Sequence, residues 1–286
     1  MKTNRLFRIA SLVCAFLMFS AREGPADESL VRRVRVAECH NSPPAQLLLV
    51  WLNRTMEGLA DDPPVWQTLR ASTEEEHENL NRASVIGVYD ILFTGNEAHV
   101  RNLELQQLLR GSCPLFEERL IVVGPPGKVS GVKDLGIIDA LRKIFADESL
   151  FFTAYRDPWI DEAAKSLFDQ AGIEDPTANR QYVETGREDM DALIQAGDEG
   201  GFILTGEAAF AQYQDFQRGE EHLVKLRDTG ISRTSYACLI ANAGFRKERT
   251  RTADRYFEWL AGEEAKLAIE AFEIGGMKPF RAVRRP

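Results

Sequence analysis

The sequence predicts an α/β fold with mostly parallel sheets, and two observations support this prediction. Short apolar runs with strand character alternate with amphipathic helical patterns along the chain, which is typical of sheets whose strands are connected by helices. In addition, at least four predicted helices begin at a capped turn directly after a predicted strand, near Ser42, Asp157, Thr185 and Thr205. Ligands of open α/β sheets bind at the carboxyl ends of the strands, where these turns would collect.

The predicted strands are short runs that are rich in Val, Ile, Leu and Phe. Such runs, bounded by turn residues, are typical of strands buried in a sheet. In chain order they span residues 30–37, 85–93, 119–124, 150–153, 182–184, 202–204, 223–226 and 236–241. The second and third runs are almost entirely apolar, and we expect them to be buried.

The predicted helices are identified by apolar residues three and four positions apart and by residues that begin or end a helix. Ser42 predicts the start of the first helix and Gly58 its end, and Asp157 and Gly172 do the same for a strongly amphipathic pattern between them. Further helices are predicted over residues 67–83, 100–108 and 132–145, with two more after Thr185 and Thr205 and one or two over 253–272 with a break near Gly262.

The first 26 residues have the pattern of an export signal, and we exclude them from the fold. Lys2, Arg5 and Arg8 precede an apolar run over residues 9–19, and small residues follow it. This arrangement is typical of a secretory signal peptide, and the run is too short to span a bilayer. We therefore expect a periplasmic or extracellular protein without a transmembrane segment.

The composition excludes some partners and leaves the state of the cysteines open. The formal net charge is −9, and an acidic chain is poorly suited to nucleic acid or to an anionic membrane surface. The sequence has none of the common metal-binding or cofactor-binding motifs, so we expect no metal and no cofactor. Cys39, Cys113 and Cys238 follow the export signal. A Cys39–Cys113 disulfide and buried free thiols both remain compatible with the sequence.

One sequence pattern occurs twice between residues 181 and 213. In each copy a short extended run leads into a Thr-Gly pair, Thr185-Gly186 and Thr205-Gly206, and then into a helical pattern. A threonine that caps a helix after a strand directs free backbone N–H groups to one place, which is suited to binding an anion. Thr185 and Glu188 also match a capping box. The alternative is that both threonines are ordinary caps of surface helices.

The same region resembles the tungstate-binding subunits of bacterial ABC importers, a group within the type II periplasmic binding proteins. The similarity is carried by Val-Gly-Pro at 123–125, Tyr-Val-Glu-Thr-Gly at 182–186 and Phe-Ile-Leu-Thr at 202–205. This resemblance implies two α/β lobes, joined by a hinge near Glu118 and Asp228. The implied division is a signal peptide over 1–26, lobe one over 27–118 and 229–286, and lobe two over 119–228.

The resemblance implies an exported solute-binding protein that captures a small ligand between its lobes and delivers it to an ABC permease. A tungstate-type or molybdate-type oxyanion is the implied ligand. The chain would need no catalytic residue for this role. The residues expected to bind the ligand are Asn41, Ser42, Thr94, Thr153, Arg156, Thr185, Gly186 and Thr205.

This sequence departs from the family pattern where the ligand is expected. Glu38-Cys39-His40-Asn41 stands where the family has Thr-Thr-Thr-Ser, Arg156 is displaced by two positions, and Ile160 replaces a threonine. Several hydroxyl donors are therefore lost, and a carboxylate at Glu38 would repel an anion. Two alternatives stay open: a binding-protein-like sensor or docking module that has lost the oxyanion site, and a periplasmic enzyme using His40 and Cys39.

Overall fold

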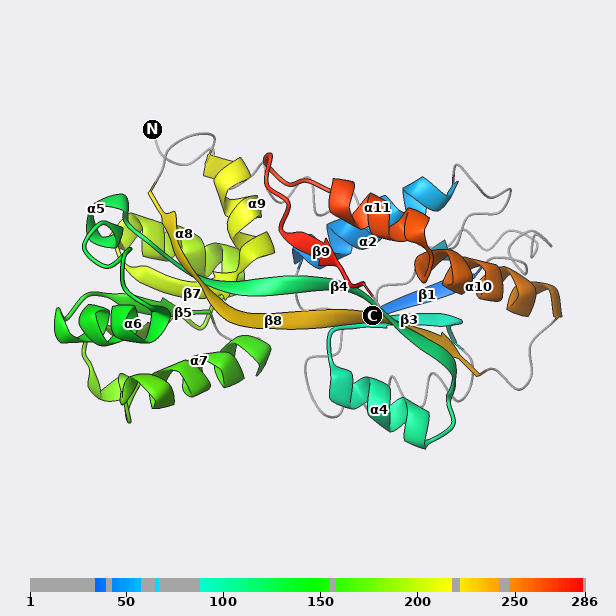
Figure 1. The fold of residues 1–286 in the computed structure, drawn as a ribbon, viewed down its shortest axis with the longest axis horizontal. Helices are drawn as coiled ribbons and strands as arrows, with labels where there is room; N and C mark the ends of the chain where they lie inside the picture. Colours follow the sequence, from blue (N-terminus) through cyan, green and yellow to red (C-terminus); the bar gives the residue numbers. More distant parts are fainter. Residues whose placement is uncertain are drawn as a thin grey trace. The chain divides into compact units, whose positions relative to one another are not determined.

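The computed structural model describes residues 34–39, 43–57, 65–66, 88–154, 158–217, 222–241 and 247–284. The chain from Arg33 to Pro286 forms one compact unit, shown in Figure 1. The predicted export signal, the helix predicted over 67–83 and the predicted binding residues Asn41, Ser42 and Arg156 lie outside the described residues.

The described strands form one nine-stranded sheet in the order β2-β1-β3-β8-β4-β7-β5-β6, with β9 paired to β4. Pairing is parallel at both ends of this sheet, β2-β1-β3 and β7-β5-β6. It is antiparallel in the middle, where β3, β8, β4 and β7 meet. The strands are β1 (Arg35–Cys39), β2 (Val65–Trp66), β3 (Ile91–Thr94), β4 (Leu109–Gly124), β5 (Phe151–Thr153), β6 (Tyr182–Glu184), β7 (Phe202–Gly206), β8 (Val224–Ile240) and β9 (Phe280–Ala282).

Most of the described helices lie where their periodicity predicts them. The α-helices are α2 (Pro43–Glu57), α4 (Glu97–Leu105), α5 (Pro126–Val129), α6 (Ile137–Ala146), α7 (Pro158–Ala171), α8 (Asp189–Glu199), α9 (Glu207–Gln217), α10 (Lys247–Leu260) and α11 (Glu263–Ala271), with a short 3-10 helix η2 (Pro176–Ala178). The helix end predicted at Gly172 is confirmed, since this glycine has a φ of +71° directly after α7. Such a conformation is the usual end of a helix.

Two long antiparallel strands replace three of the predicted short ones. The run predicted over 119–124 is only the end of β4, and the runs at 223–226 and 236–241 belong to the single strand β8. The parts of β4 and β8 that were not predicted to be strands contain charged residues such as Glu118 and Arg233, and such a polar composition is typical of loops. These side chains are buried as an ion pair, so the polar segment continues as a strand.

Four hydrophobic clusters of described residues give the chain its two α/β lobes. In one lobe, α2, α10 and α11 pack on one face of the sheet and α4 on the other. In the second lobe, α6 and α7 pack on one face, and α8 and α9 on the other. Figure 1 shows β4 and β8 running through both lobes. This agrees with the predicted type II periplasmic-binding-protein fold.

The pairing of β4 with β8 is interrupted close to the predicted hinge. Arg119 pairs with Ser232 and Ile121 with Asp228, so three residues of β8 oppose one residue of β4. Gly230 at the centre of this bulge has a φ of +77°, a left-handed conformation that favours glycine. A bulge bends and twists a strand locally, and we expect the lobes to pivot here. The lobe boundaries themselves stay a prediction.

The cysteines of the described chain are free and buried, so of the two alternatives that the sequence left open the structure has free thiols and no Cys39–Cys113 disulfide. Cys39 packs with Ala37 in the cluster under α4, whereas Cys113 packs with Val36 in the cluster under α2. Successive residues of a strand point to opposite faces of a sheet. The two thiols therefore lie on opposite sides of the sheet.

Candidate ligand-binding site

The structure brings Thr153 and Thr185 together at the carboxyl ends of two parallel strands. The backbone N–H and the hydroxyl of Thr185 both donate to the backbone carbonyl of Thr153, at 3.2 and 3.0 Å. The N–H of Arg187 donates in turn to the Thr185 hydroxyl at 3.2 Å. Gly186 between them has a φ of +63°, which folds the chain into a tight turn. This turn lies at the edge where α/β proteins bind ligands.

The Thr153 side chain is buried beside Tyr182, which lies on β6 two residues before Glu184, the register partner of Thr153. Burial raises the pKa of Tyr182, and a hydrogen bond to the Thr153 side chain partly offsets this shift. The phenol therefore stays neutral at physiological pH. Thr153 is thus fixed by a neighbouring side chain and its backbone carbonyl is fully engaged by Thr185, which holds this strand end in one arrangement.

The predicted helix caps at the two Thr-Gly pairs are wrong. Helix α8 begins at Asp189 after Glu188, which makes no side-chain capping hydrogen bond, so Thr185 and Glu188 do not form a capping box. The left-handed turn at Gly186 separates Thr185 from the helix. Thr205 lies inside β7, and α9 begins directly after that strand ends. Both threonines are therefore strand-end residues rather than caps.

Thr205 lies on the opposite face of the sheet from Thr153. Thr153 pairs with Leu204, which packs against α6 and α7, whereas Thr205 pairs with Ile121, which packs against α8 and α9. The Thr205 hydroxyl is buried and has no hydrogen-bond partner within the described part of the chain. The structure therefore separates Thr205 from the pair formed by Thr153 and Thr185.

Thr94 belongs to the other lobe, at the carboxyl end of β3. It pairs with Cys39 at the end of β1 and is fully buried. Its hydroxyl accepts a hydrogen bond from the N–H of Asn96, at 3.2 Å, and the Asn96 side chain caps α4 by accepting from the N–H of His99. Thr94 thus stabilises the turn into α4.

A buried ion pair between the two long strands was missed by the sequence analysis. Glu118 of β4 and Arg233 of β8 lie opposite each other, with 2.9 Å between Oε2 and Nη2, and their side chains are only 3% and 9% exposed. The Arg233 guanidinium also lies over the Trp159 ring in the first turn of α7, 4.4 Å from its centroid. Nothing in the sequence links residues so far apart, and only strand pairing brings them together.

A second charged group surrounds the start of α9. Glu207, the first residue of α9, pairs with Arg119 at 2.7 Å and with Lys225 at 2.7 Å. Arg119 also pairs with Asp228 at 2.9 Å, beside the bulge in β8. These charges join β4, β8 and α9 close to the predicted hinge.

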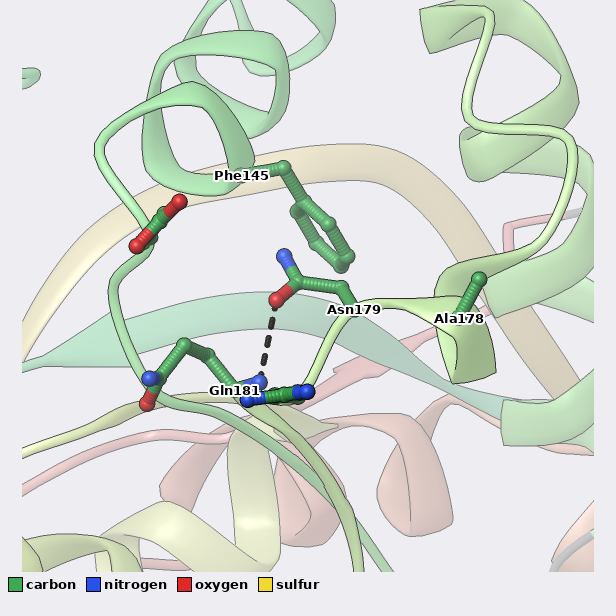
Figure 2. A pocket seen from close by; sticks show the side chains of 6 residues that line it. Phe145, Ala178, Asn179 and Gln181 are labelled. Carbon is green, nitrogen blue, oxygen red and sulfur yellow. Dashed lines mark hydrogen bonds between the residues drawn. The ribbon is translucent and has the colours of Figure 1, made fainter.

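A hollow of about 580 Å³ lies at the other end of β5 and β6. It is lined by Phe145, Glu148, Ala178, Asn179, Arg180 and Gln181. Figure 2 shows the Asn179 amide oxygen accepting from the Gln181 N–H, at 2.9 Å. Because these residues precede the strands, the hollow lies at their amino ends, away from Thr153 and Thr185.

Two further properties of the described residues bear on function. No group of three or more His, Cys, Asp and Glu side chains within these ranges is arranged to hold a metal ion. None of the described helices has the length and apolar character needed to cross a membrane.

Comparison with known proteins identifies the fold. No family model and no curated protein matches this sequence. Among solved structures, a tungstate-binding protein, TupA, from Desulfovibrio alaskensis G20 has a TM-score of 0.71 and 20% identity over 88% of this chain and 99% of that chain.

Two other solved structures extend this comparison. A tungstate ABC transporter protein from Geobacter sulfurreducens has a TM-score of 0.63 and 16% identity, over 84% of this chain and 98% of that chain. Iron-bound HitA from Pseudomonas aeruginosa has a TM-score of 0.61 and 12% identity, over 82% and 83%. The chain therefore has the two-lobed fold of these proteins, and the resemblance seen in the sequence is confirmed for the fold. Different ligands occur on this fold, so the fold does not fix the ligand.

Proposed function

We propose that this protein is an exported solute-binding protein of an ABC importer. It captures a small oxyanion of the tungstate or molybdate type between its lobes, passes it to a permease and performs no catalysis. The observation that carries the proposal is the joined strand ends at Thr153 and Thr185. They bring the tight turn at Gly186 to the carboxyl edge of lobe two, where the end of β5 leads through residues 155–157 into α7.

An anion fits this edge for electrostatic reasons. Helix α7 has 14 residues, and the N-terminus of such a helix carries partial positive charge and free N–H groups. Arg156 precedes this helix by two positions and supplies a full positive charge. Asp161 in the first turn of α7 opposes an anion. We therefore expect weaker affinity than at an edge without this carboxylate.

The two lobes would close on the ligand from opposite sides. In this proposal Asn41, Ser42 and Thr94 approach from lobe one, and Thr153, Arg156, Thr185 and Gly186 from lobe two. Thr205 would act indirectly, because it lies on the other face of the sheet. The bulge at Gly230 would serve as the pivot, and lobe two would span about residues 119–228 as the sequence predicts.

A second candidate is a sensor or docking module that has kept the fold and lost the oxyanion site. It is favoured by Glu38, whose side chain is buried at the end of β1. A carboxylate at this strand end disfavours an anion in the cleft. This candidate predicts that the protein binds none of the oxyanions tested.

The deciding experiment measures the melting temperature of the protein with tungstate, molybdate, sulfate, phosphate, organic acids and amino acids. A ligand at one hundred times its Kd stabilises the folded state by about 2.7 kcal/mol. Calorimetric titration would then compare the wild type with Arg156→Ala and Thr185→Ala, using the exposed Arg142→Ala and Thr55→Ala as controls. We expect binding to be lost only in the first pair. Unchanged affinity in that pair, or no response to any oxyanion, would contradict the proposal.

A further inference from the structure

Arg233 is held in one orientation by the buried carboxylate of Glu118. One oxygen of this carboxylate pairs with the Arg233 Nη2 at 2.9 Å, and the other accepts from the backbone N–H of Ala208, at 3.3 Å. Both side chains are almost completely buried. A buried charge is tolerated when it is paired and hydrogen-bonded. The guanidinium is therefore neutralised and fixed, and does not act as a free anion-binding group.

The second contact of Arg233 is made to lobe two. Its guanidinium lies over the indole ring of Trp159, 4.4 Å from the ring centroid. Trp159 is the second residue of α7, and its ring is partly buried against the cluster that holds α6 and α7. A cation over the face of a tryptophan is a favourable and directional contact. Arg233 thus limits the positions that the first turn of α7 can take.

This contact crosses the bulge in β8. β8 packs against the cluster of α6 and α7 through Leu226 before the bulge and through Ile231 directly after Gly230. Arg233 lies two residues farther on, where β8 pairs with β4 again at Glu118. A change of angle at the bulge would therefore change the distance between the guanidinium and the indole. The contact between Arg233 and Trp159 is suited to fix the angle between the two parts of β8.

The opposite side of the sheet is already joined by α9. Ala208 and Ala211 of this helix pack in the cluster of α2, α10 and α11, while Ala209 and Phe210 pack in the cluster of lobe two. Figure 1 shows α9 on the side of the sheet opposite α7. Because α9 packs into both clusters, it holds the two lobes together on its own side of the sheet. A change in the angle between the lobes would therefore mainly widen or narrow the gap between them on the side of α7.

We propose that Arg233 is a positioning residue that sets the geometry of the ligand cleft through Trp159. The expected effect of Arg233 on ligand affinity rests on the proposed function. Its expected effect on the geometry of the lobes does not. Arg233 does not touch the ligand. It fixes the first turn of α7, three residues after Arg156, and thereby fixes the distance between lobe two and lobe one.

The first test measures lobe geometry without ligand, in the chain that lacks residues 1–26. Nitroxide labels at Arg101→Cys on α4 and Lys165→Cys on α7 would report the distance between the lobes by pulsed electron resonance. Both positions are exposed, and the three cysteines in the described ranges are buried. We expect Trp159→Leu to shift or broaden the distance distribution, and Trp159→Phe, which keeps an aromatic face, to preserve it.

The charged partner is tested without leaving a buried charge unpaired. The double variant Glu118→Gln with Arg233→Met removes both charges together, and we expect the same broadened distribution as for Trp159→Leu. Arg233→Lys keeps a cation and should restore a distribution close to that of the wild type. Trp51→Leu on α2 is the matched control, because that indole lies far from the bulge in the chain and donates to the Ala268 carbonyl.

The second test measures tungstate affinity in the same variants. We expect Trp159→Leu and the double variant to weaken binding roughly tenfold, equivalent to about 1.4 kcal/mol, with Trp159→Phe and Arg233→Lys close to the wild type. Failure of the wild type to bind tungstate would overturn the proposed function alone, and the label distances would still decide the role of Arg233. Unchanged distances in both Trp159→Leu and the double variant would overturn the inference.

Discussion

The hydroxyl of Thr185 donates a hydrogen bond to the backbone carbonyl of Thr153 at 3.0 Å. The same carbonyl also accepts from the backbone N–H of Thr185, so one residue closes the end of β5 onto the end of β6. The hydroxyl accepts from Arg187 as well, and it therefore holds the turn at Gly186. These bonds connect local turn chemistry directly to the edge proposed to bind the ligand.

Thr185→Val removes these two hydroxyl hydrogen bonds while keeping the side-chain volume. We expect the free energy of unfolding to fall by about 1 kcal/mol, measured by urea denaturation. Thr185→Ser keeps the hydroxyl and should remain within about 0.5 kcal/mol of the wild type. Equal losses in the two variants would show that the methyl group, rather than the hydroxyl, holds the turn.

Gly206 is required because the Glu118 carboxylate occupies the space of a side chain there. A Cβ at this position would collide with the Glu118 Oε1, and Glu118 is fixed by Arg233. We expect Gly206→Ala to cost about 1–3 kcal/mol, as overpacking usually does. Gly127→Ala is the control, because nothing lies within 4 Å of its added Cβ. The measurement is a urea unfolding curve, and equal stability of the two variants would refute this account.

Glu207 stabilises the junction of β4, β8 and α9 because its buried carboxylate pairs with Arg119 and Lys225. Glu207→Gln removes the carboxylate that both cations share and leaves Arg119 with Asp228 alone, and we expect a loss of about 1–3 kcal/mol. The matched control is Glu97→Gln, whose partner Arg101 lies in an exposed pair on α4 and which should cost less than about 0.5 kcal/mol. Thermal unfolding would measure the loss of stability in the two variants. Similar losses would contradict the claim that the Glu207 pairs stabilise the protein because they are buried.

Because the Cys238 thiol is buried, we expect the protein to lose stability at alkaline pH. Burial raises the pKa of this thiol from 9.0 to about 12, with smaller contributions from Cys113 and Glu104. The unfolded chain loses this proton at a lower pH than the folded chain. The stability that the buried, neutral thiol contributes is therefore fully present below pH 9.0 and is lost as the pH rises toward about 12. The limiting slope is about 1.4 kcal/mol per pH unit.

This dependence is measured by urea unfolding of the wild type and of Cys238→Ala at several pH values from 8 to 10. The tyrosines whose pKa burial also raises are the same in both proteins, so the difference between the two slopes reports Cys238. Cys238→Ala lowers stability at every pH through the cavity that it leaves. However, its stability should fall less steeply with pH than that of the wild type. Identical slopes in the two proteins would show that Cys238 is not the titrating group.

Several elements were predictable because their causes are local. Gly172 ends α7 and Gly262 separates α10 from α11, as their positions in the sequence indicate. Apolar residues at helical spacing placed α7 correctly. These features depend on residues within one or two turns of each other, so no knowledge of distant partners is needed.

The sequence by itself determined the α/β class, most helix positions and the edge of the sheet where threonines gather. Only the tertiary structure decided that Thr205 faces away from Thr153, that Cys39 and Cys113 lie on opposite sides, and that β8 continues through Arg233. The reason is that strand register and strand pairing depend on partners far away in the chain. Arg233 is a strand residue because Glu118, 115 positions earlier, neutralises it, and a local pattern of residues does not contain that contact.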